Sequence, residues 1–373
     1  MDVKFLEPGG DADFLVGTTN GFWGSLNGTP SIATDFVHGG HQKSIKYPLS
    51  QSAGCLSKTG TLADAGSRIS LYIFINAYGS SGNINVLSLR NSSGTQLVNV
   101  RITSTGVLQL WNANTAQIGS NGPTLSTGQW YRISIAYTIT STTVNSFKLW
   151  VNGGSLLSVT NATLSAIGTS IFAVGNLAGD IIDLRSSDHY IDDSTSLTDP
   201  GNIWVTAKRP NANGITNGFS TQIGSGGSGY GSGHSSQVNE RPLSTTNGWS
   251  MVGAGSAVTE EYNIEAQNVG DIDISTATIV DWLGWVSAKS LVGETGNVII
   301  DGASVAQAIT TTPTLYTKIK GSTTYPSGTG ADIGFQTTTA LTTVSLYECG
   351  VIVAYIPAGG STPKRRMFPG IAR

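Results

Sequence analysis

Apolar and polar residues alternate with period two along two neighbouring segments near the middle of the chain, 128–137 and 147–151. This alternation predicts β-strands that bury one face, because successive side chains of a strand point to opposite sides. Residues 138–146, between the two segments, are mainly Ser and Thr, which is typical of a hairpin turn. Asn152-Gly153 then follows, and both residue types tolerate the positive φ of a tight turn. We therefore predict a central β-hairpin.

Segments of the same kind recur at short intervals before this hairpin, at 69–75, 86–89, 97–102 and 107–111. Regular spacing of short strands is typical of a sandwich or a barrel. Three further apolar strands are predicted in the second half of the chain, at 278–286, 297–300 and 347–355. In the first of these, Trp282 and Trp285 are three residues apart and should face opposite sides, so that one ring reaches a subunit interface.

The pattern divides the chain into four parts. Residues 1–200 are predicted to form one sandwich with an irregular N-terminal segment, and 201–236 a connecting strand with a Gly/Ser-rich loop. A second, smaller sandwich is expected over 237–357, and a basic C-terminal arm over 358–373. The fold class is therefore predicted to be all-β.

The composition and net charge of the chain indicate which classes of partner are expected. Of the 373 residues, 12% are charged and 48 are Gly, which suits an all-β protein with many turns. The formal net charge of -3 gives no general attraction to nucleic acid or to an anionic membrane, so we expect neither as a partner. The first residues, Met1 to Phe5, lack the apolar core of a signal peptide. Cys55 and Cys349 lie far apart, and we expect both to be buried thiols.

The order of these parts resembles a group of tailed-phage virion proteins. The central hairpin carries the Gly-x-Trp-Tyr-x-Ile and Val-Asn-Gly pattern of laminin G-like, concanavalin A-like jelly-roll sandwiches, and a second sandwich follows. The resemblance covers roughly residues 65 to 357, although the stretch 224–233 is richer in Gly than that pattern and the first sixty residues match less clearly. The matching pieces are 85–90, 106–110, Trp130, Asp192-Asp193, 205–211, 238–242 and the last strand near Tyr355.

This resemblance implies a virion component that is made in the host cytoplasm and present in many copies. We expect a homo-oligomer that binds other virion proteins, such as the major capsid or tail protein. Capsid decoration is the first hypothesis, and a tail or fibre component or a glycan-binding adhesin is the alternative. Because such a sandwich buries its sheets without needing a catalytic residue, we expect a recognition or assembly module rather than an enzyme.

A glycan site is one hypothesis for the lectin-like fold. Sugar rings stack on exposed aromatic side chains and are surrounded by amides. Trp111 with Asn112 and Asn114, or Tyr230 in the Gly/Ser-rich loop, fits this description, although Trp111 also fits a core role.

Calcium is the one cofactor that the sequence suggests. Five carboxylates crowd a short region, and Ca²⁺ prefers oxygen ligands. These residues are Asp180, Asp183, Asp188, Asp192 and Asp193. The alternative is that they accept hydrogen bonds from loop amides. Two histidines in His38-Gly39-Gly40-His41 are too few to predict a second metal site.

Two charged segments complete the candidates. Glu261 and Glu265 resemble part of a glucanase carboxylate set, but the central Asp is missing, so a solvated strand face is expected. The C-terminal tail combines three basic residues with an apolar tip, which suggests an arm that docks on a neighbouring subunit. Its residues are Lys364, Arg365, Arg366, Met367 and Phe368.

Overall fold

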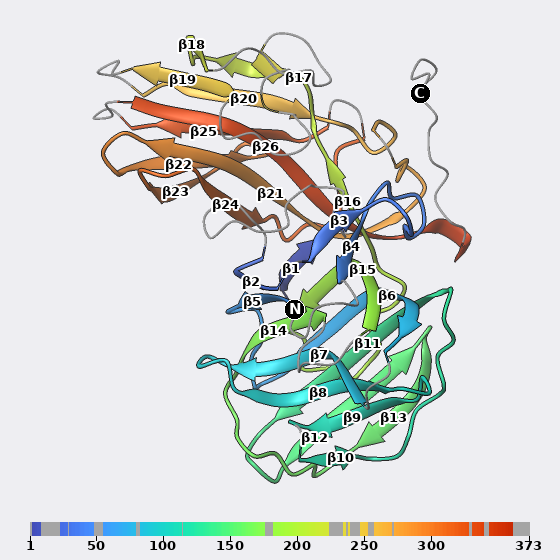
Figure 1. Ribbon diagram of the computed structural model, residues 1–373. Coiled ribbons are helices and arrows are strands. Elements are labelled where there is room, and N and C mark those ends of the chain that lie inside the picture. The colour runs from blue at the N-terminus through green and yellow to red at the C-terminus, as the bar shows by residue number, and fades with distance from the viewer. Residues whose placement is uncertain are drawn as a thin grey trace.

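The predicted strands assemble into two β-sandwiches, drawn one above the other in Figure 1. The structure is a computed structural model. It describes residues 2–8, 23–28, 30–47, 55–79, 83–113, 115–175, 182–223, 234–235, 238, 247–252, 257–270, 272–327, 330–338 and 343–360. Every pairing between described strands is antiparallel, and the all-β fold class is confirmed.

The first sandwich consists of an eight-stranded and a seven-stranded sheet. The eight-stranded sheet has the order β13-β12-β11-β6-β15-β4-β3, and β1 also pairs with β15. Its strands are β13 (Gly154–Val159), β12 (Asn145–Val151), β11 (Trp130–Ile139), β6 (Ser67–Tyr78), β15 (Ile182–Asp192), β4 (Ser44–Tyr47), β3 (Ser31–Ala33) and β1 (Val3–Glu7). The other sheet runs β10 (Ala116–Ile118), β9 (Leu108–Asn112), β8 (Gln96–Thr103), β7 (Asn83–Asn91), β14 (Thr169–Gly175), β5 (Cys55–Thr59) and β2 (Ser25–Asn27).

The second sandwich has a six-stranded and a five-stranded sheet. The first runs β18 (Thr221–Ile223), β19 (Gly248–Val252), β26 (Thr343–Ile356), β21 (Thr278–Ser290) and β24 (Thr314–Ile319), with β16 (Trp204–Lys208) also paired with β26. The second runs β17 (Pro210–Asn217), β20 (Thr259–Ile264), β25 (Asp332–Thr337), β22 (Glu294–Ile300) and β23 (Ala303–Ile309). Part of the predicted connector, 204–223, therefore belongs to the sheets of this sandwich.

The central hairpin is present as predicted. β11 and β12 pair from Ile133–Val151 to Ile139–Asn145, and Asn152 has a φ of 49°. Alternation decides which side chains are inside, since Ile69, Leu71 and Ile73 of β6 are buried in the core between the sheets. The side chains between them form the outer face of the eight-stranded sheet, and this face positions the candidate site.

The two sandwiches share an apolar junction. Leu283, Trp285, Ile352 and Ala354 of the second sandwich belong to the same buried cluster as the core of the first. β1 contacts β16, β21 and β26 (Figure 1). Trp282 lies in the core of the second sandwich, so the two indoles do face opposite sides. Trp285 thus reaches a contact between sandwiches of one chain.

One 3₁₀ turn, Ala358–Gly360, follows the last strand. Within the ranges described above, no helix has the length and apolar character needed to cross a membrane. Cys349 is a buried free thiol, as predicted.

Candidate functional site

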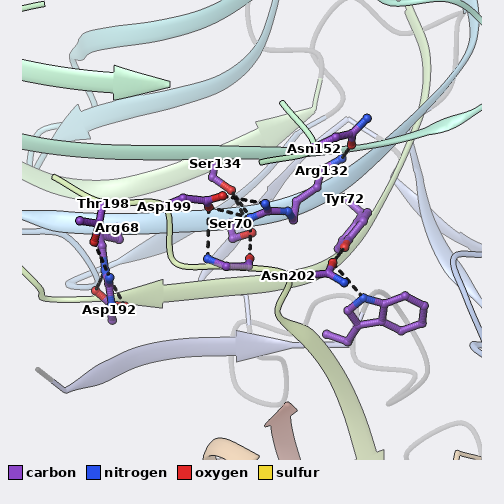
Figure 2. Close-up of polar contacts among 12 residues, drawn as sticks. Arg68, Ser70, Tyr72, Arg132, Ser134, Asn152, Asp192, Thr198, Asp199 and Asn202 are labelled. Carbon is purple, nitrogen blue, oxygen red and sulfur yellow. Dashed lines mark hydrogen bonds and ion pairs between the residues drawn. The ribbon is translucent and has the colours of Figure 1, made fainter. Parts of the chain in front are cut away.

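The outer face of the eight-stranded sheet carries a row of polar and aromatic side chains. Arg68, Ser70 and Tyr72 alternate along β6, and Arg132 and Ser134 lie beside them on β11. Figure 2 shows these side chains on one side of the sheet. A flat sheet face of this kind is a natural platform for a ligand, because polar groups converge beside aromatic rings.

The chain itself covers this platform with the segment that leads from β15 to β16. Arg132 donates two hydrogen bonds of 2.7 Å to the carboxylate of Asp199, one to each oxygen (Figure 2). Arg68 forms an ion pair of 2.7 Å with Asp192 and donates a hydrogen bond to Thr198. These bidentate, partly buried charge pairs occupy the polar groups of this face with partners from the same chain.

These ion pairs set the pKa of Asp199 in the covering segment, residues 193–203 between β15 and β16. Burial would raise the pKa of Asp199, but the guanidinium of Arg132 outweighs it and lowers that pKa. The hydroxyl of Tyr72 donates a hydrogen bond to Asn202 Oδ1, and the indole N–H of Trp204 donates a second one to the same oxygen at 3.2 Å. Asn202 therefore connects the sheet of the first sandwich with the first strand of the second.

Next to Tyr72, two histidines and an aspartate form a buried cluster, the His38–His41–Asp188 cluster. His38 Nδ1 lies 2.7 Å from Asp188 Oδ2, and His41 Nε2 lies 2.9 Å from Asp188 Oδ1. The potential ligand atoms of the three residues all lie within 4.8 Å of one another. Among the described residues, this is the only group of three or more His, Cys, Asp or Glu side chains that meets this criterion.

A bulge in β15 aims Asp188 into this cluster. The pairing of β15 with β6 shifts register between Ser187 and Tyr190, and Asp188 has a φ of 53°. Asp is one of the few residues that adopt this left-handed conformation readily. The bulge turns the Asp188 carboxylate out of the ladder, so that its Oδ1 also accepts the Val205 N–H of β16 at 2.6 Å.

Charge and aromatic rings surround the cluster. Burial would raise the pKa of Asp188, but His41 and His38 hold that pKa well below its usual range. The His38 ring stacks on Tyr72 with centroids 3.7 Å apart, and Trp204 lies at 4.5 Å. Gly39 has a φ of 55°, and a Cβ there would overlap the Trp204 ring. The loop is thus pressed against the junction of the two sandwiches.

A second histidine cluster lies on the core side of β15. His189 Nδ1 is 2.7 Å from Glu7 Oε2, and His189 Nε2 is 3.0 Å from Ser186 Oγ. These distances match those of a nucleophile, base and acid in acyl transfer. All three residues are at most 1% exposed, however, and the His189 ring packs against Trp23 and Phe172. In the described part of the chain, the Ser186 hydroxyl is buried, and the cluster packs as part of the core.

The predicted glycan residues are only partly brought together. Trp111 lies under the Arg101 guanidinium at 4.0 Å from its ring centroid and donates to Gln109. Asn112 lines a surface hollow of about 360 Å³, and its side-chain oxygen accepts the Ser165 N–H. The other lining residues are Ala116, Gln117, Ile118, Gly119, Val159, Ala162 and Thr163. Asn114 and Tyr230 lie outside the described residues.

The predicted calcium carboxylates have separate partners. Asp183 pairs with Arg185, Asp188 with the two histidines, Asp192 with Arg68, and Asp193 with Lys4. These four carboxylates therefore do not form one oxygen-ligand site, and the register shifts of β15 contribute to their separation. Asp180 and the arm residues Lys364, Arg365, Arg366, Met367 and Phe368 lie outside the described part of the chain.

Comparisons with known proteins bear on the fold. No family model and no curated protein matches the chain. Among solved structures, an endo-β-1,4-glucuronan lyase from the fungus Trichoderma reesei is similar at 14% identity and a TM-score of 0.41, over 53% of this chain and 99% of that one. A cellulose-induced protein, Cip1, has 17% identity and a TM-score of 0.37, over 46% and 88%. At these identities the likeness concerns the fold alone.

Two further solved structures are similar to part of the chain. Domain 4 of an extracellular arabinanase from Geobacillus stearothermophilus, in complex with arabinotriose, has 16% identity and a TM-score of 0.33, over 52% of this chain and 94% of that one. A Trypanosoma rangeli sialidase mutant has 12% identity and a TM-score of 0.34, and the match spans 29% of its length. The expectation that the chain is not an enzyme was wrong as an inference from fold, since solved structures of enzymes share this sandwich architecture.

Sequence reasoning named three residues of the candidate site but missed their association. It judged His38 and His41 too few to predict a metal site, and it named Asp188 among the candidate calcium ligands, with hydrogen bonding to loop amides as the alternative. The contact between His38 and Asp188 joins residues 150 positions apart, which no local pattern reports. The useful signal was the His-x-x-His spacing in a Gly-containing loop.

Proposed function

We propose that this protein is a structural component of a tailed-phage virion, attached in many copies as an accessory on the capsid surface. The order of its parts supports this, because it resembles virion proteins that join a laminin G-like sandwich to a second one. The observation that carries the proposal is the apolar junction, with Trp285 packed into the cluster of the first sandwich. A rigid two-sandwich unit suits repeated attachment to a lattice, where many weak contacts add up.

The covered outer face also favours assembly over sugar recognition on that sheet. Arg132 and Asp199 fill the platform that a ligand would need, and both groups are already paired. Contacts with other virion proteins would then use strand edges and loops, such as the connection between β21 and β22, where Leu291 and Val292 are 68% and 60% exposed.

Immunogold electron microscopy of intact particles with an antibody against this chain tests the proposal. Label over the head, together with saturable binding of the purified chain to undecorated shells, is the expected result. Label confined to the tail would replace capsid decoration by a tail or fibre role. Particles that carry none of this chain by mass spectrometry would contradict the virion role altogether.

A glycan-binding role is the second candidate, favoured by the hollow beside Asn112. A volume of about 360 Å³ is at the lower end for small-ligand sites. Gln117 lines the hollow, and its side-chain amide donates to Asn121 at the surface. Saturable binding on a glycan array that Gln117→Ala abolishes, while the matched Gln222→Ala in the second sandwich retains it, would support this role. Equal binding by both variants would exclude the hollow as the site.

A further inference from the structure

The His38–His41–Asp188 cluster has the donor set of a transition-metal site. Two imidazole nitrogens and one carboxylate oxygen suit ions such as Zn²⁺, whereas Ca²⁺ prefers oxygen ligands alone. The donors come from a loop and from β15, and all three residues are buried. We propose that this cluster binds one divalent transition-metal ion of the Zn²⁺ class at the junction of the two sandwiches.

The observed distances support this assignment. Two donors held about 2.0 to 2.1 Å from one ion are about 3.0 to 3.4 Å apart. The nitrogen–oxygen separations in the cluster are 2.7 and 2.9 Å. An ion therefore needs the imidazoles to move outward from Asp188 by only a few tenths of an ångström.

The charge balance points the same way. The Asp188 carboxylate is completely buried, and its ion pairs are formed with the two histidines. A buried carboxylate needs a compensating charge, because burial of an unpaired ion is costly. Hydrogen bonds from the two imidazoles and from the Val205 N–H stabilise this carboxylate in the structure, and a bound cation would neutralise its charge directly.

The loop that carries the histidines is fixed by contacts that need no metal. Asp35 forms an ion pair with Arg185 of β15 at 2.5 Å, and the Phe36 ring stacks on Phe74 at 4.5 Å. Trp130 donates its indole N–H to the carbonyl of Val37 at 3.1 Å. Contacts just before His38 therefore pre-organise the ligands, which lowers the ordering cost of binding.

Three protein donors are one fewer than a closed structural zinc site has. The bound ion would thus keep one solvent-derived ligand. The aromatic rings of Tyr72, Trp130 and Trp204, which contact the His38 ring, would lie beside it. Asp188 also accepts the Val205 N–H of β16, so the ion would stabilise the first strand of the second sandwich against β15. The site does not depend on the proposed virion role.

The test uses the full chain without a histidine tag. The chain has only four histidines, so background binding is small. After EDTA treatment and dialysis, the protein is incubated with Zn²⁺ and unbound metal is removed. Inductively coupled plasma mass spectrometry then measures the moles of Zn²⁺ bound per mole of chain. We expect about one Zn²⁺ per chain and a Tm raised by a few degrees, as linkage requires for a ligand of the folded state. Ca²⁺ should do neither.

Two histidine variants localise the ion. His41→Asn should lose stoichiometric binding, and the matched control His234→Asn in the second sandwich should keep it. Co²⁺ in the wild-type chain should give a visible absorption spectrum of nitrogen and oxygen ligands. This measurement needs no variant and therefore decides the case even if His41→Asn fails to fold. Absence of both Zn²⁺ and Co²⁺ binding by the wild type, or equal binding by the two variants, would overturn the site.

Discussion

Two buried histidine–carboxylate clusters lie on opposite sides of β15, and the adjacent residues Asp188 and His189 belong to one each. On the core side, the imidazole of His189 is central, with a carboxylate on Nδ1 and a hydroxyl on Nε2. On the outer side, the carboxylate of Asp188 is central, with two imidazoles and a backbone amide around it.

Both clusters combine imidazole and carboxylate groups, and they differ in which residue stands at the centre of the hydrogen bonds. A central imidazole has both ring nitrogens occupied, so its hydrogen-bond chain is complete within the core. A central carboxylate instead accepts hydrogen bonds from several nitrogens, and it brings two imidazoles and one carboxylate together, the donor set on which the proposed metal site rests. The bulge at Asp188 creates this contrast, because it breaks the alternation of β15: Asp188 turns to the outer side of the sheet, and His189 stays on the core side.

The largest expected effect is that of Asp188→Ala, measured in EDTA by urea and thermal unfolding. The substitution leaves the Val205 N–H and two imidazoles without their shared buried acceptor. We expect a loss of about 3 to 5 kcal/mol in the free energy of unfolding, as for other broken buried ion pairs.

The matched control is Asp193→Ala, whose carboxylate pairs with Lys4 and is 31% exposed. An exposed pair of this kind contributes about 0 to 1 kcal/mol. If the two variants were equally stable, Asp188 would not be the hub of the outer cluster, and the contrast between the two sides of β15 would disappear.

A smaller effect is expected on the core side. Glu7→Gln keeps the shape of the side chain and an acceptor for His189 Nδ1, so only the charge-assisted part of the hydrogen bond is lost. We expect a loss of about 1 to 2 kcal/mol in the free energy of unfolding. Glu261→Gln, on a partly exposed strand, is the control and should stay within about 0.5 kcal/mol of the wild type. If Glu7→Gln lost as much unfolding free energy as Asp188→Ala, the two clusters would contribute equally to stability, and the contrast between the two sides of β15 would not hold.

Much of the fold could be predicted from the sequence because period-two alternation reports a strand and its buried face. The strand at 69–75 lies within β6, and 130–139 and 145–151 form the predicted hairpin. The opposite orientation of Trp282 and Trp285 follows from the same rule. Alternation does not report which surface a face packs on, so it could not show that Trp285 reaches the other sandwich.

The candidate site could not be predicted as a unit, because its contacts join distant residues. Arg132 and Asp199 are 67 positions apart, and the covering segment carries no periodic pattern. Nothing local indicates that a bulge turns Asp188 toward His38 and away from the other aspartates. The His-x-x-His spacing is visible in the sequence but is too little to predict a metal site, because the contact of Asp188 with both histidines depends on tertiary structure.

The covering segment should give the smallest effect, visible mainly in acid. The pKa of Asp199 is lower in the folded chain than in the unfolded one, despite partial burial, because Arg132 is beside it. Its contribution is then complete above the unfolded pKa of about 3.9 and is lost as the pH falls through the lower folded value. Asp199→Asn should cost about 1 kcal/mol at pH 7 and progressively less below pH about 4. Unfolding midpoints of both proteins across this range measure the difference. If the difference in unfolding free energy between the wild type and Asp199→Asn stayed constant into acid, the charge of Asp199 would not stabilise the covering segment. Packing would then hold this segment on the sheet, as packing holds the core cluster around His189 together.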